Sequence, residues 1–428
     1  GSTGQIRSAP QGKSQPGAGR LMAGTECRDD RAAFAGTGGR IPAAFKDLPT
    51  PCYILDEKAL RRNGEILGKL AQETGCRILL AQKAFSNYDL YPVLQPYLAG
   101  TEASGLYEAR LGVEEMPGRE VHVFCAAYRA EDMEELLKYA DHIVFNSPSQ
   151  LAAFGPMTKA AGKSVGLRIN PEHSTQEGHA IYDPCAPGSR MGTTREQWDL
   201  ALEKDPALAE LLDGLHFHTL CEQDSDALEE TLEAVEEKFG DLLPGMKWLN
   251  MGGGHHITRP GYDLERLKKV IRHAREKWGV MVYLEPGEAC ALNAGYLLTT
   301  VLDTVKNKDT QIAILDASAA CHMPDVIEMP YLPPVLGAEA ADCADSRTWR
   351  LAGPTCLAGD VIGDYRFPGE IIPGERLLFG DMAIYTTCKN NTFNGMPFPA
   401  IWVYREDGTC EELVHFGYED FKARLGKI

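Results

Sequence analysis

Residues 77–86 read Arg-Ile-Leu-Leu-Ala-Gln-Lys-Ala-Phe-Ser. The apolar run predicts a short strand that is buried on both faces, as in a parallel sheet. Lys83 comes two residues after the run, so its amine is predicted at the carboxyl end of the strand, where it could be desolvated and act as a nucleophile. Taken alone, a solvated lysine is the commoner explanation of such a residue. Whether Lys83 is a nucleophile or a solvated surface residue therefore has to be judged from the rest of the sequence.

Short apolar runs of the same kind recur after residues 77–81 and are separated by amphipathic stretches. The amphipathic stretches include residues 132–139, 226–239 and 264–278, which have helical spacing. Eight strands that alternate with helices predict an α/β fold, a (β/α)8 TIM barrel with its active site at the carboxyl ends of the strands. A doubly wound open sheet is the competing arrangement, but no G-x-G-x-x-G pattern follows any early strand. The seven further strands are predicted at residues 100–103, 121–125, 142–145, 164–169, 214–217, 247–250 and 280–284.

The pattern changes after about Leu292, where strand-like segments follow one another between Gly, Pro and Asp turns. We expect a barrel over residues 48–292 and a mostly antiparallel β-barrel or sandwich domain over 293–428, closed by a helix at 418–425. A first strand at 51–56 could join the second domain. The strands of the second domain are predicted at residues 296–305, 311–316, 350–352, 376–379 and 400–404.

The remaining features of the sequence set broad limits on function. Residues 1–47 are interpreted as a flexible leader, because residues 1–40 have no periodic apolar face and no apolar core of signal-peptide length. No apolar run approaches the roughly 20 residues of a membrane span. The net charge of -18 argues against nucleic-acid binding and would attract a cationic small molecule. The 12 scattered cysteines contain no C-x-x-C pair, which favours a reducing cytoplasm.

Two histidines, His216 and His218, end the sixth predicted barrel strand. Alternation places both on one face. The H-x-H pair could be half of a metal site, but no third ligand lies at a useful spacing, so no metal is predicted. We interpret a flat imidazole here as a group that stacks on an aromatic cofactor ring.

Glycines and a carboxylate follow the seventh and eighth predicted strands. Gly252, Gly253 and Gly254 could present backbone N–H groups to a phosphate, or could form only a tight turn. The late-strand position in a barrel favours the phosphate. Glu285, in Glu-Pro-Gly-Glu, could keep a pyridine nitrogen protonated and so make the ring an electron sink.

The second domain offers two more groups in glycine-punctuated loops. Cys356 lies in Gly-Pro-Thr-Cys, and Tyr385 ends Asp-Met-Ala-Ile-Tyr. Each is a weak signal alone, since a thiol such as Cys356 is more often an inert buried residue.

Taken together, these motifs resemble the fold-type III pyridoxal-phosphate decarboxylases, the group of ornithine, arginine and diaminopimelate decarboxylases with an alanine-racemase-like barrel. The resemblance covers essentially residues 48–428 and is closest to the branch that decarboxylates carboxynorspermidine and carboxyspermidine. The stretches that carry it are residues 50–53, 81–86, 167–171, 189–192, 216–222, 321–325 and 389–395.

The resemblance implies a role for each matching residue. Lys83 would bind pyridoxal 5'-phosphate covalently, His218 would stack on its ring and Glu285 would pair with its pyridinium. Arg168 would support the ring side of the pocket, and Cys356 would act as an acid supplied across a homodimer interface. The phosphate site would consist of Gly252, Gly253, Gly254, Gly287 and Tyr385.

Two departures bear on the substrate. The residue after Glu-Pro-Gly is an arginine in ornithine-type enzymes and is Glu288 here. With Asp325, it could bind the protonated amines of carboxynorspermidine or carboxyspermidine, precursors of norspermidine and spermidine. In addition, Leu357, Ala358 and Gly359 separate Cys356 from the next acidic residue, Asp360.

Three alternatives stay open at this point. A diaminopimelate or other basic amino-acid decarboxylase would share the cofactor residues but would want an arginine in place of Glu288. A racemase on the same fold would need a second base. A non-catalytic carrier of pyridoxal phosphate is usually a single barrel, so the second domain counts against it.

Overall fold

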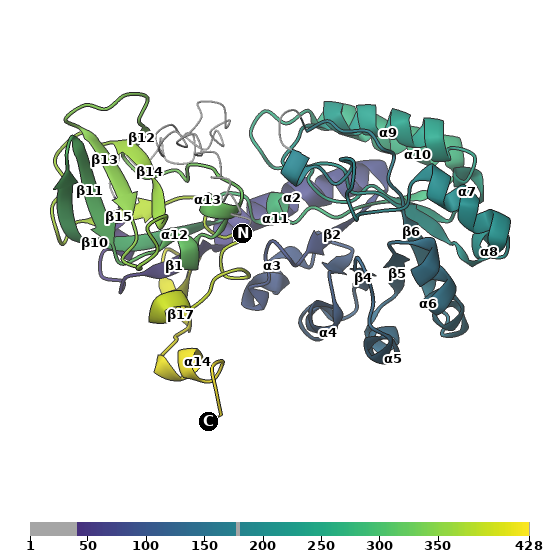
Figure 1. Ribbon diagram of the computed structural model, residues 1–428, viewed down its shortest axis with the longest axis horizontal. Helices are drawn as coiled ribbons and strands as arrows, with labels where there is room; N and C mark the ends of the chain where they lie inside the picture. Colours follow the sequence, from purple (N-terminus) through teal and green to yellow (C-terminus); the bar gives the residue numbers. More distant parts are fainter. Residues whose placement is uncertain (1–40, 177–179, 428) are drawn as a thin grey trace, which may run out of the picture.

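The computed structural model describes residues 41–176 and 180–427, which form a closed parallel barrel and a separate nine-stranded sheet (Figure 1). Six of the eight strand pairings in the sheet are antiparallel. The predicted combination of a TIM-like barrel and a mostly antiparallel β domain is confirmed. None of the helices in these residues is long and apolar enough to cross a membrane.

The eight barrel strands pair in chain order, and the last pairs with the first. Each lies within one residue of its predicted bounds at both ends, because strands buried on both faces form continuous apolar runs that are visible in sequence. The barrel strands are β2 (Arg77–Ala81), β3 (Gly100–Ala103), β4 (Glu120–Phe124), β5 (His142–Phe145), β6 (Ser164–Arg168), β7 (Gly214–His216), β8 (Trp248–Asn250) and β9 (Met281–Leu284).

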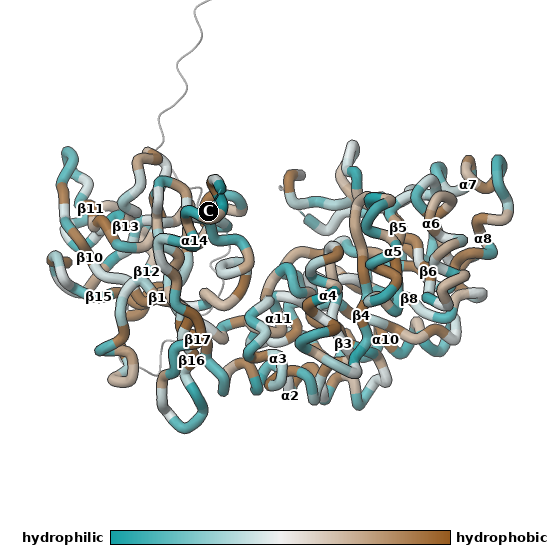
Figure 2. Tube along the Cα trace, turned by 90° about the horizontal axis from the view of Figure 1, so that it is seen from below, coloured by the Kyte–Doolittle hydropathy of each residue, from teal (hydrophilic) through white to brown (hydrophobic). Residues whose placement is uncertain are grey.

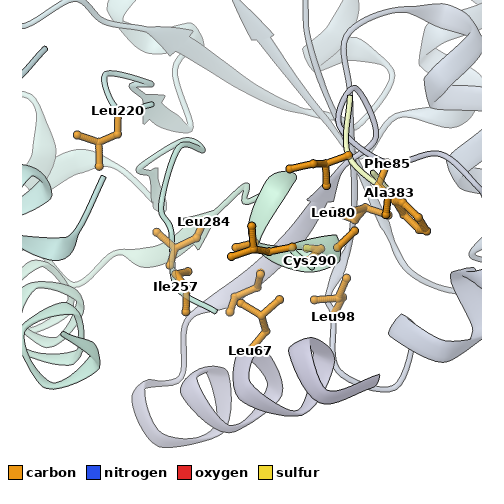
Figure 3. Packing of buried hydrophobic residues seen from close by; sticks show 14 of the residues in the cluster. Leu67, Leu80, Phe85, Leu98, Leu220, Ile257, Leu284, Cys290 and Ala383 are labelled. Carbon is orange, nitrogen blue, oxygen red and sulfur yellow. The ribbon is translucent and has the colours of Figure 1, made fainter. Parts of the chain in front are cut away.

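Amphipathic helices surround the barrel (Figure 1). In α10 (Leu264–Trp278), apolar residues at helical spacing face the strands, Asp263 caps the first turn by accepting from the Arg266 amide, and Gly279 ends the helix with a φ of 67°. The interior is continuous: Leu67 of α2, Leu80 of β2 and Cys290 of α11 are fully buried in one cluster (Figure 3). The other helices that line the barrel are α2 (Glu57–Thr74), α4 (Leu106–Glu115), α5 (Ala130–Tyr139), α6 (Pro148–Ala160), α7 (Arg195–Lys204), α9 (Ser225–Phe239) and α11 (Glu288–Ala291).

The sheet is built around its longest strand, β10, and includes a strand that precedes the barrel. β1 pairs antiparallel with β10 and parallel with β16, so the first strand lies in the sheet rather than in the barrel. Three short strands, β12, β14 and β17, were not predicted. The sheet strands are β1 (Cys52–Asp56), β10 (Gly295–Asn307), β11 (Thr310–Leu315), β12 (Glu339–Ala340), β13 (Thr348–Ala352), β14 (Val361–Arg366), β15 (Arg376–Phe379), β16 (Ala400–Tyr404) and β17 (Cys410–Val414).

Several helices lie where the barrel and the sheet meet. Figure 2 shows the long helix α2 and the short helices α3 (Tyr91–Leu94) and α11 at the edge of the barrel that faces the sheet. Two more, α12 (Ala319–His322) and α13 (Asp325–Glu328), follow β11, and the chain ends with α14 (Tyr418–Lys422). The helix predicted at 418–425 therefore stops three residues earlier.

The predicted leader boundary at residue 47 is too late. Phe45, in a 3-10 turn at Ala43–Phe45, is only 1% exposed. Its ring packs on Tyr404 with centroids 5.2 Å apart, and Arg376 bonds to the Phe45 carbonyl. This apolar burial places the end of the predicted leader in the folded sheet lobe. Residues 1–40, the rest of that prediction, lie outside the described residues.

Candidate active site

Lys83 lies in the turn after β2, and its backbone is held by the sheet lobe. The Tyr385 amide donates to the Ala84 carbonyl (2.9 Å), and the Cys388 thiol donates to the Lys83 carbonyl (3.1 Å). The Lys83 side chain is exposed. Its main chain is therefore fixed by the sheet lobe, and its charge acts on the side chains of Glu285 and His218 at the ends of other barrel strands.

Glu285, directly after β9, is a buried carboxylate with a partner on each oxygen. The Asn250 amide donates to Oε1 (2.7 Å), and His216 Nε2 lies 3.0 Å from Oε2. Burial opposes ionisation, but His216, Asn250 and the charge of Lys83 outweigh it, so the pKa of Glu285 lies below its ordinary value. This environment favours an ionised carboxylate, the form required to hold a proton on a pyridine nitrogen.

His216 has a different environment from the one its sequence position suggested. Its ring is stacked on Phe124, with centroids 5.6 Å apart and planes 11° apart, and it bonds to Glu285. His216 therefore orients the carboxylate, which the sequence analysis did not anticipate.

His218 and Arg168 lie together beside this carboxylate. Arg168 Nη2 donates to the His218 carbonyl (3.1 Å), and its guanidinium lies 4.6 Å from the Phe124 ring centroid. Burial, followed by the charges of Lys83 and Arg168, holds the pKa of His218 well below its ordinary value. A neutral, flat imidazole is available at the position where the sequence predicted a ring-stacking group.

A second buried carboxylate, Glu102 at the end of β3, was missed. Burial and the neighbouring charge of Glu285 raise the pKa of Glu102 well above its ordinary value, although Lys83 and Arg168 act in the opposite direction. Glu108 lies nearby; burial raises its pKa, and Lys83 lowers it in part. Glu102 lies within the last two residues of β3, whereas Glu285 directly follows β9, so its sequence position did not mark it as a strand-end group.

The glycine run after β8 packs closely against the segment after β7. A Cβ on Gly252 would lie 2.3 Å from the Phe217 carbonyl oxygen, and one on Gly254 would lie 2.0 Å from that of Leu220. Both residues also have positive φ, 68° and 80°. Glycine is therefore required at both positions by close approach of the backbone.

Two of the three amides in this run already have acceptors within the chain. The Gly252 amide donates to Asn250 Oδ1 (2.9 Å), and the Gly253 amide donates to His218 Nδ1 (3.0 Å). A phosphate could accept from Gly253 only after His218 turns away. Gly287 has no room for a side chain, because a Cβ there would lie only 2.6 Å from the Cβ of Ala84, in the turn that carries Lys83.

Tyr385 and the predicted substrate carboxylates lie on the sheet side of the site. Burial and the charges of Glu288 and Asp325 are among the causes that hold the pKa of the half-buried Tyr385 well above its ordinary value. Glu288 Oε1 lies 3.7 Å from His256 Nε2. Tyr385 and both predicted substrate carboxylates are thus close enough to influence one another.

Asp325 has a cationic partner that the sequence analysis did not assign. Lys389 Nζ lies 2.5 Å from Asp325 Oδ1 and 2.5 Å from Glu328 Oε2. Lys389 stands in a stretch that carries the family resemblance, but nothing in a single sequence connects it with Asp325, which is 64 positions away. The acidic pair is thus a site that holds an ammonium group.

Cys356 is not brought to this cluster. It is exposed after β13, and its amide donates to Asn394 Oδ1 (3.0 Å). Asp360 holds the loop by accepting from Thr355 Oγ1 (2.7 Å) and Ser318 Oγ (2.8 Å). Within residues 41–176 and 180–427, no interaction links Cys356 to the barrel side chains.

The donor set fits pyridoxal phosphate. An accessible amine, an ionised buried carboxylate and a neutral imidazole are gathered at the strand ends, beside glycine backbone that side chains would obstruct. These groups match the aldehyde, pyridine nitrogen, ring face and phosphate of that cofactor.

Comparison with known proteins supports the same interpretation. Residues 52–383 match the family described as "Pyridoxal-dependent decarboxylase, C-terminal sheet domain". The chain is 42% identical over 383 residues to carboxyaminopropylagmatine decarboxylase of Synechocystis sp., covering 89% of this chain and 97% of that protein. It is 38% identical over 390 residues to carboxynorspermidine/carboxyspermidine decarboxylase of Campylobacter jejuni, covering 89% and 99%. The crystal structure of the C. jejuni carboxynorspermidine decarboxylase with norspermidine superposes with a TM-score of 0.79, covering 88% of this chain and all of that one.

Proposed function

The chain belongs to the pyridoxal-dependent decarboxylases that carry a C-terminal sheet domain, and we propose that it decarboxylates an α-amino acid whose long side chain carries protonated amines. The proposed substrates are carboxynorspermidine and carboxyspermidine, whose decarboxylation is a step of polyamine biosynthesis. The observation that carries the proposal is the acidic pair Asp325 and Glu328, which in this chain holds the ammonium group of Lys389 at 2.5 Å from each carboxylate. A substrate amine would take the place of Lys389 there.

A second substrate deserves equal testing because the Synechocystis relative is 42% identical. Carboxyaminopropylagmatine has the same kind of amino-acid head, but its agmatine end is a guanidinium. A carboxylate can bind a guanidinium through two parallel hydrogen bonds. Diaminopimelate is not favoured, because its distal carboxylate would meet Glu288, Asp325 and Glu328.

The protein's own groups divide the work. When bound, pyridoxal phosphate supplies an electron sink for the electron pair that carbon dioxide leaves behind. Lys83 would hold the cofactor through its amine, which the substrate amine would replace, and Glu285 would hold a proton on the pyridine nitrogen. Glu102 and Glu108 lie near enough to Lys83 to affect, and be affected by, its charge.

Recognition of the cofactor requires one internal hydrogen bond to be exchanged. His218 would have to release the Gly253 amide to stack on the cofactor ring, and that amide would then be available as a donor to the phosphate. Tyr385 adds its hydroxyl, which stays protonated and able to donate because burial raises its pKa.

We further propose a homodimer that works in a reducing cytoplasm. Cys356 is exposed in its own subunit, and we propose that a second copy uses its thiol as the acid that returns a proton to the α-carbon. Every cysteine in the described residues is a free thiol, which is the usual state of cytoplasmic proteins.

Carbon dioxide release tests the substrate proposal. The holoenzyme is assayed with carboxynorspermidine, carboxyspermidine, carboxyaminopropylagmatine, ornithine and meso-diaminopimelate. We expect kcat/KM to be highest for one of the first three. Equal turnover of all five, or a preference for diaminopimelate, would reject the assignment of the acidic pair. Borohydride reduction followed by peptide mapping should locate the cofactor on Lys83.

A further inference from the structure

Three side chains that are common metal ligands meet at the opposite end of the barrel from Lys83. Glu120 begins β4, His122 is two residues further along it, and His142 begins the neighbouring strand β5 (Figure 1). His122 and His142 are directly paired across the two strands. The ligand atoms of the three side chains all lie within 4.8 Å of one another. This group, Glu120, His122 and His142, is called the floor cluster below.

The floor cluster contains buried polar atoms without hydrogen-bond partners. His122 is only 1% exposed, yet neither of its ring nitrogens has such a partner among the described residues. The same is true there of His142 Nδ1 and Glu120 Oε2. Folded proteins rarely leave such groups unmet, because each loses its hydrogen bonds to water.

The carboxylate is already oriented. Arg77 Nη1 and the Tyr283 hydroxyl both donate to Glu120 Oε1, at 3.1 and 3.0 Å. This leaves Oε2 available, 3.9 Å from His122 Nε2. Partners that fix a ligand in this way are typical of metal sites, where the groups behind the ligands orient them.

Aromatic rings surround both imidazoles. The two histidine rings are stacked with centroids 3.9 Å and planes 25° apart, Tyr283 lies 4.6 Å from His122, and Trp248 lies 4.9 Å from His142. Because the lone pair of an imidazole nitrogen lies in the ring plane, one of the two rings has to turn out of this stack before both can bind one ion. The rings exclude water on these sides. The Glu120 side chain is 26% exposed, so the cluster remains open to ions from the floor of the barrel.

We propose that the floor cluster binds one late first-row divalent cation, with Zn²⁺ as the best match, and so ties β4 to β5. Two imidazoles and one carboxylate are a usual donor set for Zn²⁺, and water would complete a tetrahedron. Bond lengths of about 2.0–2.2 Å put the ligand atoms of a tetrahedron roughly 3.3–3.6 Å apart, so the 3.9 Å between Glu120 and His122 would have to shorten by about 0.3–0.6 Å. A pair as far apart as 4.8 Å would have to close by about 1.2–1.5 Å.

The charge of Arg77 opposes a cation, but only in part. Its side chain is 48% exposed and paired with Glu120, so water and the carboxylate screen it. The site is structural rather than catalytic, because it lies at the amino ends of strands whose carboxyl ends form the active site.

The test uses tag-free holoenzyme, stripped with chelator, incubated with Zn²⁺ and dialysed. We expect about one Zn²⁺ per chain by elemental analysis, and a visible Co²⁺ absorption band of tetrahedral type after substitution. Zn²⁺ should also raise Tm. His142→Gln should abolish the Tm rise and weaken binding roughly tenfold or more, with pyridoxal phosphate absorbance retained as evidence of folding.

The matched control is His415→Ala, which removes an exposed imidazole that also lies beside a glutamate, Glu412, at 3.7 Å. It should bind Zn²⁺ as the wild type does. If His142→Gln does not fold, Glu120→Gln replaces it. Two outcomes would overturn the proposal: a wild type that keeps no ion, which leaves the floor as aromatic packing, or equal binding by wild type and His142→Gln.

Discussion

His216 Nε2 lies 3.0 Å from one carboxylate oxygen of Glu285, and both side chains are almost completely buried at the mouth of the barrel. The pair explains how a carboxylate that is 5% exposed can stay ionised. Burial alone would favour the neutral acid, whereas the imidazole and Asn250 stabilise the anion.

Replacing His216 with Phe should therefore make Glu285 a weaker partner for the cofactor. The pKa of Glu285, now held below its ordinary 4.5, should rise. The acid limb of the kcat profile should move to higher pH, and kcat should fall roughly tenfold to a hundredfold, as with loss of a supporting residue elsewhere. A pH–rate profile with spectra of the bound cofactor measures both. An acid limb that stays in place would contradict the role given to His216.

Gly253→Ala should weaken cofactor binding. The new Cβ would lie 2.7 Å from the Glu285 carbonyl oxygen and 3.0 Å from His218 Cε1. Overpacking of this kind costs about 1–3 kcal/mol, which is roughly 5- to 150-fold in the Kd for pyridoxal phosphate. Gly245→Ala is the control, since its Cβ would have nothing within 4 Å. Equal affinity of the two variants would remove Gly253 from the cofactor site.

Asp325→Asn should raise KM for carboxynorspermidine while changing kcat little. A hydrogen bond to a charged group contributes about 1.5–3 kcal/mol, so an effect of roughly tenfold or more is expected. Glu328→Gln should do less, because that side chain is 59% exposed and is screened by water. A fall in kcat at constant KM in Asp325→Asn would instead place Asp325 at the reacting carbon.

Mixing two inactive variants tests whether subunits share their sites. Lys83→Ala and Cys356→Ala, refolded or exchanged together, should recover activity that neither has alone. Random pairing of two subunits leaves about a quarter of all sites with both groups intact. If Cys356 served the site of its own subunit, no mixed dimer would contain an intact site and no activity would return.

Much of the fold and part of the site were predictable from sequence, for identifiable reasons. The barrel strands are buried on both faces, so each forms an apolar run, and Lys83, His218 and Glu285 lie within two residues after the ends of such strands. Position at a strand end is a local property. A single sequence displays it without any knowledge of which strands are neighbours.

The residues that were missed depend on contacts between distant positions. Lys389 acquires meaning only beside Asp325, and the Gly253 amide is recognised as occupied only beside His218. The floor cluster combines Glu120 of β4 with His142 of β5, and a sequence pattern such as the H-x-H pair does not show which residues of two different strands lie side by side. Phe45 was left in the leader because one aromatic residue has no periodicity to reveal it.

The pairing of β1 with β10 and β16 has a consequence for the order of synthesis. A ribosome releases β1 before the whole barrel, but both of its partners follow the barrel, and β16 begins only at Ala400. The growing chain therefore carries an unpaired apolar strand for most of its translation. A fragment that ends at the barrel would keep that open edge permanently, so we expect it to aggregate rather than to yield an isolated barrel.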